Sequence, residues 1–222
     1  DDEDLLQAQI NKYQALVELA DIQPDDHVLE IGCGWGGFAK YVASTVGARV
    51  TGITISKEQF DFAQTSLVEA GLEDRISLQL IDYRDLRGKF DKIVSIEMFE
   101  AVGQAYWPVY FEKVAHLLKK GGCAAIQSIT IDHQAFETYQ RDPDFIQRYI
   151  FPGGMLPSIP ILQEPLKQAG LQLVEDNAYG LHYAKTLAQW RTRFNEAWPD
   201  LANAKFDSRF RRMWDLYLAY CE

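Results

Sequence analysis

The sequence has 222 residues, 47% of them hydrophobic, and a formal net charge of −10 at pH 7. This length and composition allow one sizeable core, so we expect a single domain covering residues 1–222. The acidic balance argues against nucleic acid as a main partner, because binding phosphates requires a basic face. The sequence shows neither the roughly 18 consecutive apolar residues of a membrane span nor a basic start followed by an apolar run. We therefore expect a soluble, cytoplasmic protein.

The cysteines give no sign of a disulfide framework or a metal site. Cys33, Cys123 and Cys221 are odd in number and scattered, and no C-x-x-C pair occurs. We interpret them as small apolar side chains.

The expected elements alternate between strand and helix over the first 131 residues. Strands are expected at 28–31, 49–55, 76–81, 91–96, 123–131 and 171–178, and helices at 1–20, 35–46, 56–70, 104–120, 161–169, 184–198 and 207–221. This alternation predicts an α/β fold with a Rossmann-like, doubly wound, mostly parallel sheet and helices on both faces. Ligands bind at the carboxyl ends of the strands in such sheets.

The regular alternation stops after residue 131. Residues 133–160 form an expected insertion, whose last ten residues contain three prolines and two glycines and so follow a rigid, non-helical path. We expect residues 1–131 to be a cofactor-binding half and residues 132–222 to be a substrate-binding half with extra C-terminal helices.

A glycine-rich loop follows the first expected strand. Gly32, Gly34 and Gly37 satisfy G-x-G-x-x-G, and Glu30 lies two residues before the first glycine. A dinucleotide site would place an acid at the tip of the next strand, but residues 52–56 read Gly-Ile-Thr-Ile-Ser. A carboxylate beneath the loop suits the sulfonium and ammonium of S-adenosylmethionine, which we favour over NAD.

Together these motifs resemble the cyclopropane-fatty-acyl-phospholipid synthases and the related mycolic acid cyclopropane synthases, which are class I S-adenosylmethionine-dependent methyltransferases. The resemblance covers nearly the whole chain, and the segments 151–159 and 182–187 are distinctive of the family. It is carried by the segments 28–37, 52–56 with Gln59, 82–86, 98–103, 151–159 and 182–187.

The resemblance implies which residues bind the cofactor. Beside Glu30, the implied contacts come from the glycine loop, from the ribose side and from the adenine side, namely Gly32, Gly34, Thr54, Ile55, Gln59, Asp82 and Tyr83. Such roles suit the chemistry, because Asp82 could accept from the adenine amino group and Gln59 could bond the ribose.

The resemblance also implies methyl transfer to a carbon–carbon double bond in a lipid chain, followed by ring closure. The family's base is a bicarbonate ion held by a glutamate, a histidine, a tyrosine, a cysteine and an isoleucine backbone. Glu100, Tyr183 and Ile129 match three of these, whereas Gln127 stands where the histidine is expected. A neutral amide cannot carry the charge available to histidine, which weakens the case for bicarbonate. The family's cysteine and final strand would lie outside residues 1–222, so we expect an incompletely covered chain.

Several alternatives stay open from sequence. The product could be a cyclopropane fatty acid or a methyl- or methylene-branched chain, the acceptor could be a soluble small molecule, and the protein could bind lipid or cofactor without turnover. Expected partners are unsaturated phospholipid acyl chains at the membrane surface, and a homo-oligomer is compatible with the sequence. Basic clusters at 119–120, 191–193 and 209–212 suit either a solvated helix face or anionic lipid head groups.

Overall fold

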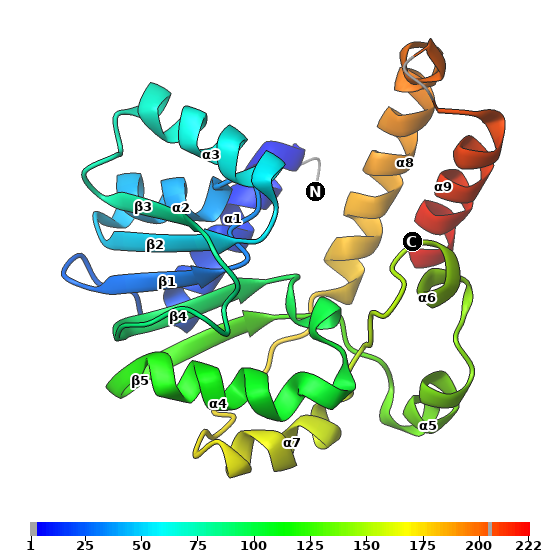
Figure 1. The fold of residues 1–222 in the computed structure, drawn as a ribbon. Helices are drawn as coiled ribbons and strands as arrows, with labels where there is room; N and C mark the ends of the chain where they lie inside the picture. Colours follow the sequence, from blue (N-terminus) through cyan, green and yellow to red (C-terminus); the bar gives the residue numbers. More distant parts are fainter. Residues whose placement is uncertain (1–3, 204–205) are drawn as a thin grey trace.

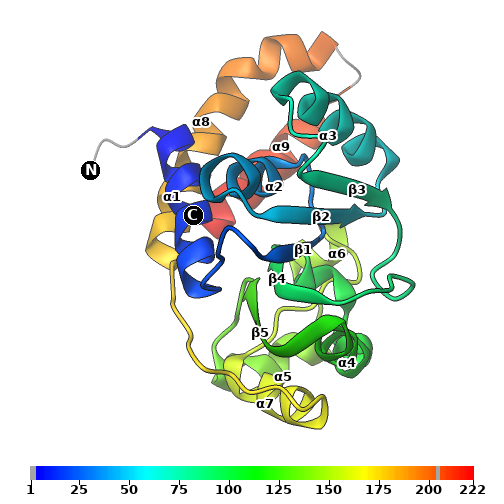
Figure 2. The same ribbon diagram turned by 90° about the vertical axis from the view of Figure 1, so that its left-hand side faces the viewer.

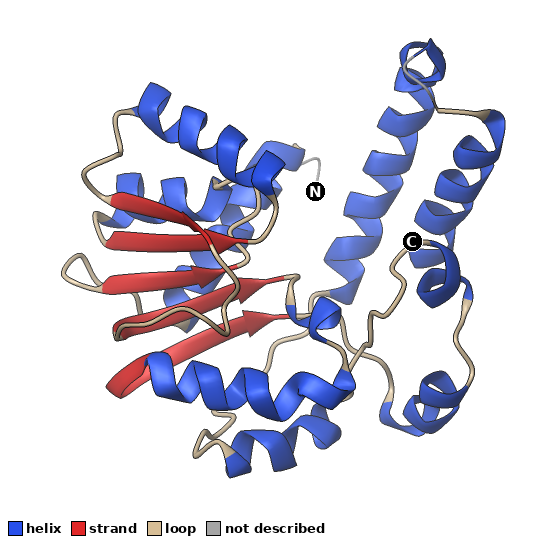
Figure 3. Cartoon of the chain, in the orientation of Figure 1, coloured by secondary structure: helices blue, strands red, loops and turns tan. Residues whose placement is uncertain are grey.

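The computed structural model describes residues 4–203 and 206–222. Its centre is a parallel sheet in the order β3-β2-β1-β4-β5, as Figures 1 and 3 show. The strands are β1 (His27–Ile31), β2 (Arg49–Thr54), β3 (Ile76–Leu80), β4 (Phe90–Ile96) and β5 (Leu118–Gln127). The predicted doubly wound α/β fold is therefore confirmed.

One face of the sheet is covered by α1 (Leu5–Leu19), α2 (Gly37–Tyr41), the π-helical turn Val42–Val46 and α3 (Lys57–Ala70). Figure 2 shows these helices together beside β1 and β2. They pack because each places an apolar stripe on the strands, with Leu16, Phe38 and Leu67 buried in one cluster. At the start of α3, the Ser56 hydroxyl accepts a hydrogen bond from the backbone amide of Gln59.

The opposite face is covered by α4 (Trp107–Leu117) and the 3-10 turns Phe99–Val102 and Gln104–Tyr106, with α7 (Ile159–Gln168) packed against α4 and α5 (His133–Arg141) against α7. This layer is rich in aromatic residues, and Phe99, Trp107 and Tyr110 are almost completely buried. Phe99 stacks on Trp107 with 5.6 Å between ring centroids. These contacts fix the segment that follows β4 against the sheet.

Two long helices stand opposite the strand tips. In Figure 1 the arrowheads point towards α8 (Gly180–Asn203), with α9 (Ser208–Cys221) and the short α6 (Phe145–Tyr149) beyond it. The Arg191 guanidinium of α8 pairs with the Asp215 carboxylate of α9 at 3.0 Å. This pair holds the pKa of Asp215 below its ordinary value. The expected helices at 184–198 and 207–221 are thus confirmed, and the first begins earlier and runs further.

Three local predictions are wrong. The strand expected at 123–131 runs from Leu118 to Gln127, so residues 128–131 lie outside it. No strand forms at 171–178, where the chain pairs with none of the described strands and leaves the Val174 side chain 90% exposed. The helix expected to reach residue 120 ends at Leu117, because Leu118 turns into extended backbone and pairs with Phe90. Within β5, Gly122 lies so close to β4 that an added Cβ would be 2.7 Å from the Asp91 carbonyl oxygen.

Within the described ranges, none of the helices combines the length and the apolar character needed to cross a bilayer. The three cysteines are free, with Cys33 buried. Burial raises the pKa of Cys33 to about 12, which keeps this thiol protonated and unreactive.

Candidate active site

The carboxyl ends of β1 and β4 bring the glycine loop beside the segment 97–100. Gly32 has a φ of +80°, and a Cβ added there would lie 2.7 Å from Cγ of Met98. Only glycine therefore fits at this contact. Around Gly34, by contrast, nothing lies within 4 Å of the same imagined atom, so this side of the loop faces open space.

Glu30 lies beneath the loop and is almost completely buried. It shares a face of β1 with Val28, which belongs to the core under α1 and α2. Among the described residues, no hydrogen bond reaches its Oε2 atom. Burial raises the pKa of Glu30 well above its ordinary value, so a bound cation would stabilise its charged form.

The end of β2 forms the second part of the predicted cofactor site. The Thr54 hydroxyl donates to Oε1 of Gln59 at 2.8 Å, and the Ser56 amide donates to the Thr54 oxygen at 3.1 Å. The Gln59 amide nitrogen is therefore the end of that side chain suited to donate to a ligand. Ile55, next along the chain, is 77% exposed.

The residues after β3 form a turn. Asp82 accepts from the Arg84 backbone amide and from its guanidinium, at 2.9 and 2.7 Å. Arg84 lowers the pKa of Asp82, so this carboxylate stays charged. Tyr83 is half-buried and meets Tyr110 edge-on, with 5.4 Å between ring centroids. The turn is fixed by Arg84, and the predicted adenine contacts remain a prediction.

Glu100 is held between two segments that the sequence places far apart. Its Oε1 atom accepts from the Ile129 backbone amide at 2.6 Å, and its carbonyl accepts from the Met155 amide at 2.9 Å. Among the described side chains, none bonds the buried Oε2 atom. Burial raises the pKa of Glu100, while the bond from Ile129 opposes this rise.

Gln127 and Tyr183 meet at a residue that the sequence analysis missed. Both donate to Oε1 of Glu97, the amide of Gln127 at 3.0 Å, and Gln127 also donates to the Tyr183 hydroxyl. The ammonium of Lys12 on α1 reaches the same Glu97 oxygen at 3.2 Å. Burial and the Glu97 carboxylate raise the pKa of Tyr183, which keeps the phenol protonated as a donor. Three of the predicted catalytic residues thus donate to two carboxylates: Ile129 to Glu100, which is the fourth, and Gln127 and Tyr183 to Glu97.

Aromatic side chains flank this cluster. Phe151, from the Pro-Gly-Gly segment, meets Tyr217 of α9 edge-on, with 5.9 Å between ring centroids. Trp35 of the glycine loop meets Phe62 of α3 in the same way at 5.2 Å, and both are more than half exposed. These rings provide apolar surface beside the strand tips.

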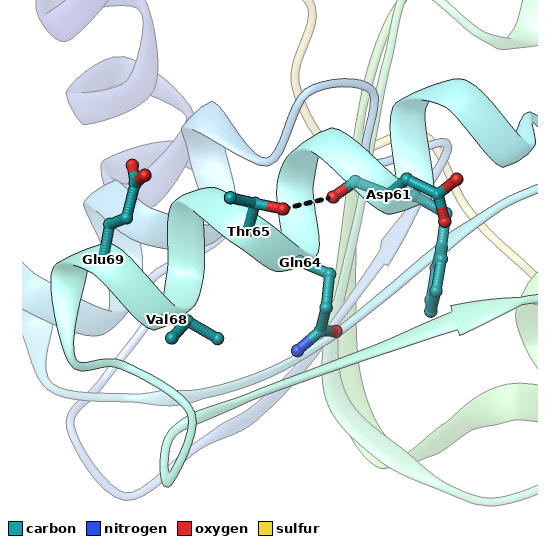
Figure 4. A pocket seen from close by; sticks show the side chains of 6 residues that line it. Asp61, Gln64, Thr65, Val68 and Glu69 are labelled. Atoms are coloured by element: carbon teal, nitrogen blue, oxygen red, sulfur yellow. Dashed lines mark hydrogen bonds between the residues drawn. The ribbon is translucent and has the colours of Figure 1, made fainter.

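A shallow hollow on α3 lies apart from these residues. Figure 4 shows it along a single helix, with Asp61, Gln64, Thr65, Val68 and Glu69 labelled. The Thr65 hydroxyl donates back to the Asp61 carbonyl at 3.0 Å, as the dashed line marks. With no residue from another element, this hollow is not a candidate active site. The described residues also contain no group of three or more metal-ligating side chains.

The fold and the loop define a class I methyltransferase domain, and comparisons with known proteins identify its family. A family model described as mycolic acid cyclopropane synthetase matches residues 1–222. The chain is 42% identical over 220 residues to the tuberculostearic acid methyltransferase of Mycobacterium tuberculosis, covering 99% of this chain and 51% of that protein. It is 38% identical over 221 residues to the cyclopropane-fatty-acyl-phospholipid synthase of Escherichia coli K12, covering 100% and 55%.

A solved structure gives the same result. The mycolic acid cyclopropane synthase CmaA1, complexed with S-adenosylhomocysteine and CTAB, matches with a TM-score of 0.91 and 28% identity, covering 100% of this chain and 80% of that one. The chain belongs to the mycolic acid cyclopropane synthetase family. It spans about half the length of the curated relatives it matches. The cofactor of this family is S-adenosylmethionine.

The two small molecules implied by the family fit this site unequally. S-adenosylmethionine fits, because the buried Glu30 has an oxygen without a partner among the described residues and the loop is open at Gly34. Bicarbonate does not fit. Ile129 already donates to Glu100, while Gln127 and Tyr183 already donate to Glu97, and two carboxylates would repel a third anion.

Proposed function

We propose that this protein transfers a methyl group from S-adenosylmethionine to the double bond of an unsaturated fatty acyl chain of a phospholipid, forming a cyclopropane fatty acid. The observation that carries this proposal is the pair of anchored carboxylates, Glu97 and Glu100, beside the glycine loop. Met98 lies between them in sequence and packs on Gly32. Carbon–carbon methylation needs negative charge at such a place, because its intermediate is a cation.

Each group has a defined task in this reaction. S-adenosylmethionine supplies an electrophilic methyl group, and we assign its binding to Glu30, Gly32, Gly34 and the residues at the ends of β2 and β3. The alkene's π electron pair forms the new carbon–carbon bond and leaves a carbocation in the chain. Glu100, held by Ile129, faces this charge with a partly buried carboxylate, where low dielectric strengthens the attraction. The Phe151 and Tyr217 rings offer apolar surface for the acyl chain.

A second candidate product is a methyl- or methylene-branched chain formed without ring closure. It is favoured by Gln127, which stands where the family resemblance leads us to expect a histidine, and whose amide carries no charge to hold an external base. The relative at 42% identity is named a tuberculostearic acid methyltransferase. The acceptor and the cofactor are the same for both products.

Contact with a lipid surface is part of the proposal, but the basic clusters support it unevenly. Lys119 is paired with Asp91 at 2.8 Å and Arg191 with Asp215 at 3.0 Å, so both cations are committed within the chain. Arg211 lies over the Trp198 ring at 5.3 Å. Arg209 and Arg212 are the remaining cations of the 209–212 cluster suited to anionic head groups.

The test is to incubate the full-length protein with methyl-labelled S-adenosylmethionine and vesicles of dioleoyl phosphatidylglycerol, with distearoyl vesicles as the saturated control. The fatty acids are then released and identified by gas chromatography and mass spectrometry. Label in a cyclopropane acid, from the unsaturated vesicles alone, is the expected result. Label in a branched acid would select the second product. Label only in polar, soluble acceptors, or in no acceptor, would contradict the proposal.

A further inference from the structure

Glu97 is held more tightly than an ordinary acid at a strand end. Three donors from three separate elements reach one of its oxygens, Oε1: Lys12 of α1, Gln127 of β5 and Tyr183 of α8. Its backbone amide also donates to the Gln127 carbonyl at 3.0 Å, which fixes both ends of the residue. Among the described residues, no hydrogen bond reaches its other oxygen, Oε2.

The backbone at Glu97 makes this arrangement costly. Its φ is +53°, a left-handed conformation that residues with a Cβ seldom adopt and that glycine adopts freely. Burial in the core does not explain the strained residue, since the Glu97 side chain is 36% exposed. Glu97 directly follows β4, at the carboxyl ends of the strands where ligands bind in such sheets. A strained residue that its neighbours hold in place there indicates a functional role.

Glu97 also lies beside the residues that we assign to the cofactor and to the carbocation, Gly32 and Glu100. It directly precedes Met98, whose side chain packs on Gly32 of the glycine loop. Glu100 lies three positions further along the chain; burial, and to a smaller extent the charge of Glu97, raises its pKa. A base is needed there, because the donors that would hold a bicarbonate ion are already taken by protein carboxylates.

We propose that Glu97 is the base of this reaction and takes the place of the bicarbonate ion. This inference rests on the proposed function. After the alkene has bonded to the transferred carbon, a C–H bond of that carbon breaks and its proton moves to Oε2 of Glu97. The electron pair of that bond closes the three-membered ring, or forms the double bond of a methylene branch after a hydride shift. The protonated Glu97 then returns its proton to water.

Lys12, Gln127 and Tyr183 are positioning residues in this account. Their bonds to Oε1 fix the carboxylate and direct Oε2 towards the substrate. Gln127 supplies two amide hydrogens, one for Glu97 and one for the Tyr183 oxygen, which a neutral histidine ring could not do. Gln127 is therefore suited to hold the Glu97 carboxylate. From sequence alone, the same residue was interpreted only as the replacement of a histidine.

The test is chemical rescue in the full-length protein. Glu97→Gly removes the carboxylate, relieves the left-handed backbone and leaves Gln127, Tyr183 and Lys12 as donors around a small space. In buffer depleted of carbon dioxide, we expect its turnover with dioleoyl vesicles to fall ~10²–10⁴-fold, the usual contribution of a general base. Added bicarbonate or formate should restore part of that turnover and should leave the wild-type rate unchanged.

Two further variants separate the carboxylate's chemistry from its packing. Glu97→Gln fills the same space with an amide, so it should be equally slow and should gain nothing from added anions. Glu69→Gln, which changes an exposed acid on α3, is the matched control and should equal wild type. S-adenosylmethionine affinity, measured by calorimetry, should be the same in all four proteins. Bicarbonate should raise the melting temperature of Glu97→Gly more than that of wild type.

The outcomes separate the two claims. Turnover of either Glu97 variant within about threefold of wild type in depleted buffer would overturn the inference, given that a general base normally contributes ~10²-fold or more. So would a failure of anions to restore any activity to Glu97→Gly, or equal bicarbonate shifts in the two melting temperatures. If wild type itself transfers no methyl group to acyl chains, the proposed function fails, and this inference falls with it.

Discussion

Replacing single glycines by alanine tests whether the cofactor loop and the carboxylates form one unit. Gly32 and Gly47 have nearly equal φ values, +80° and +85°. Alanine at either position incurs the left-handed strain of about 1–2 kcal/mol. Only at Gly32 does the new Cβ also meet another group, Met98, at 2.7 Å, whereas nothing lies within 4 Å at Gly47. Overpacking of this kind costs about 1–3 kcal/mol.

We therefore expect Gly32→Ala to lower the free energy of unfolding by about 2–5 kcal/mol and Gly47→Ala by about 1–2 kcal/mol. Urea unfolding with unchanged m-values measures the difference, which at this chain length corresponds to about 2–4 °C in Tm per kcal/mol. Because Met98 must move, Gly32→Ala should also slow methyl transfer, while Gly47→Ala should not. Equal stability losses and equal turnover in Gly32→Ala and Gly47→Ala would refute the contact between the glycine loop and residues 97–100.

The remaining predictions concern individual side chains. Glu100→Gln should leave S-adenosylmethionine binding near normal and suppress turnover, and unchanged turnover in a labelled-product assay would remove Glu100 from the site. Burial raises the pKa of Glu30 above 4.5, so the folded protein keeps a proton that the unfolded chain releases, and stability falls as pH rises from about 4.5 towards the folded pKa. Glu30→Gln has no titrating group at this position, so its free energy of unfolding relative to wild type should rise with pH. Its cofactor affinity should drop. A difference in unfolding free energy that urea titrations find to be independent of pH would contradict this. Tyr183→Phe should lower kcat by about 10–100-fold, as expected for losing a hydrogen bond to a charged group, with the cofactor Kd unchanged. A shift in cofactor Kd alone, seen by calorimetry, would place Tyr183 elsewhere. Gly34→Ala should match Gly47→Ala in stability and lose cofactor affinity, and normal binding by titration would exclude this side of the loop from the cofactor site.

The sheet and most helices could be predicted because their signals are local. Apolar runs between glycines and prolines mark the strands, and caps such as Ser56 mark helix starts. The strand predicted at 171–178 had the right composition, yet strand formation also needs a neighbouring edge to pair with, and composition cannot supply one. The early end of α4 has a similar cause, since Leu118 leaves the helix to pair with Phe90.

The site could be predicted only where a motif carried it. Glu100, Gln127, Ile129 and Tyr183 were identified from segments that resemble a family, and the structure brings their bonding groups together. Glu97 was missed because its signal is a positive φ and a set of three distant donors. Lys12, for example, is 85 positions away from Glu97 in sequence. No residue pattern reports such contacts, and an acid directly after a strand is ordinarily interpreted as a surface residue.

The most direct test of the central claim uses S-adenosylmethionine with a fully deuterated methyl group, wild-type protein and dioleoyl phosphatidylglycerol vesicles. Mass spectrometry of the released fatty acids counts the deuterium atoms on the added carbon. If the acyl double bond is the acceptor and a base, which we assign to Glu97, removes a deuteron from the transferred carbon, the product keeps two of the three deuterium atoms. Retention of all three would mean that the proton leaves from elsewhere, and unlabelled acyl chains would contradict the proposed reaction itself.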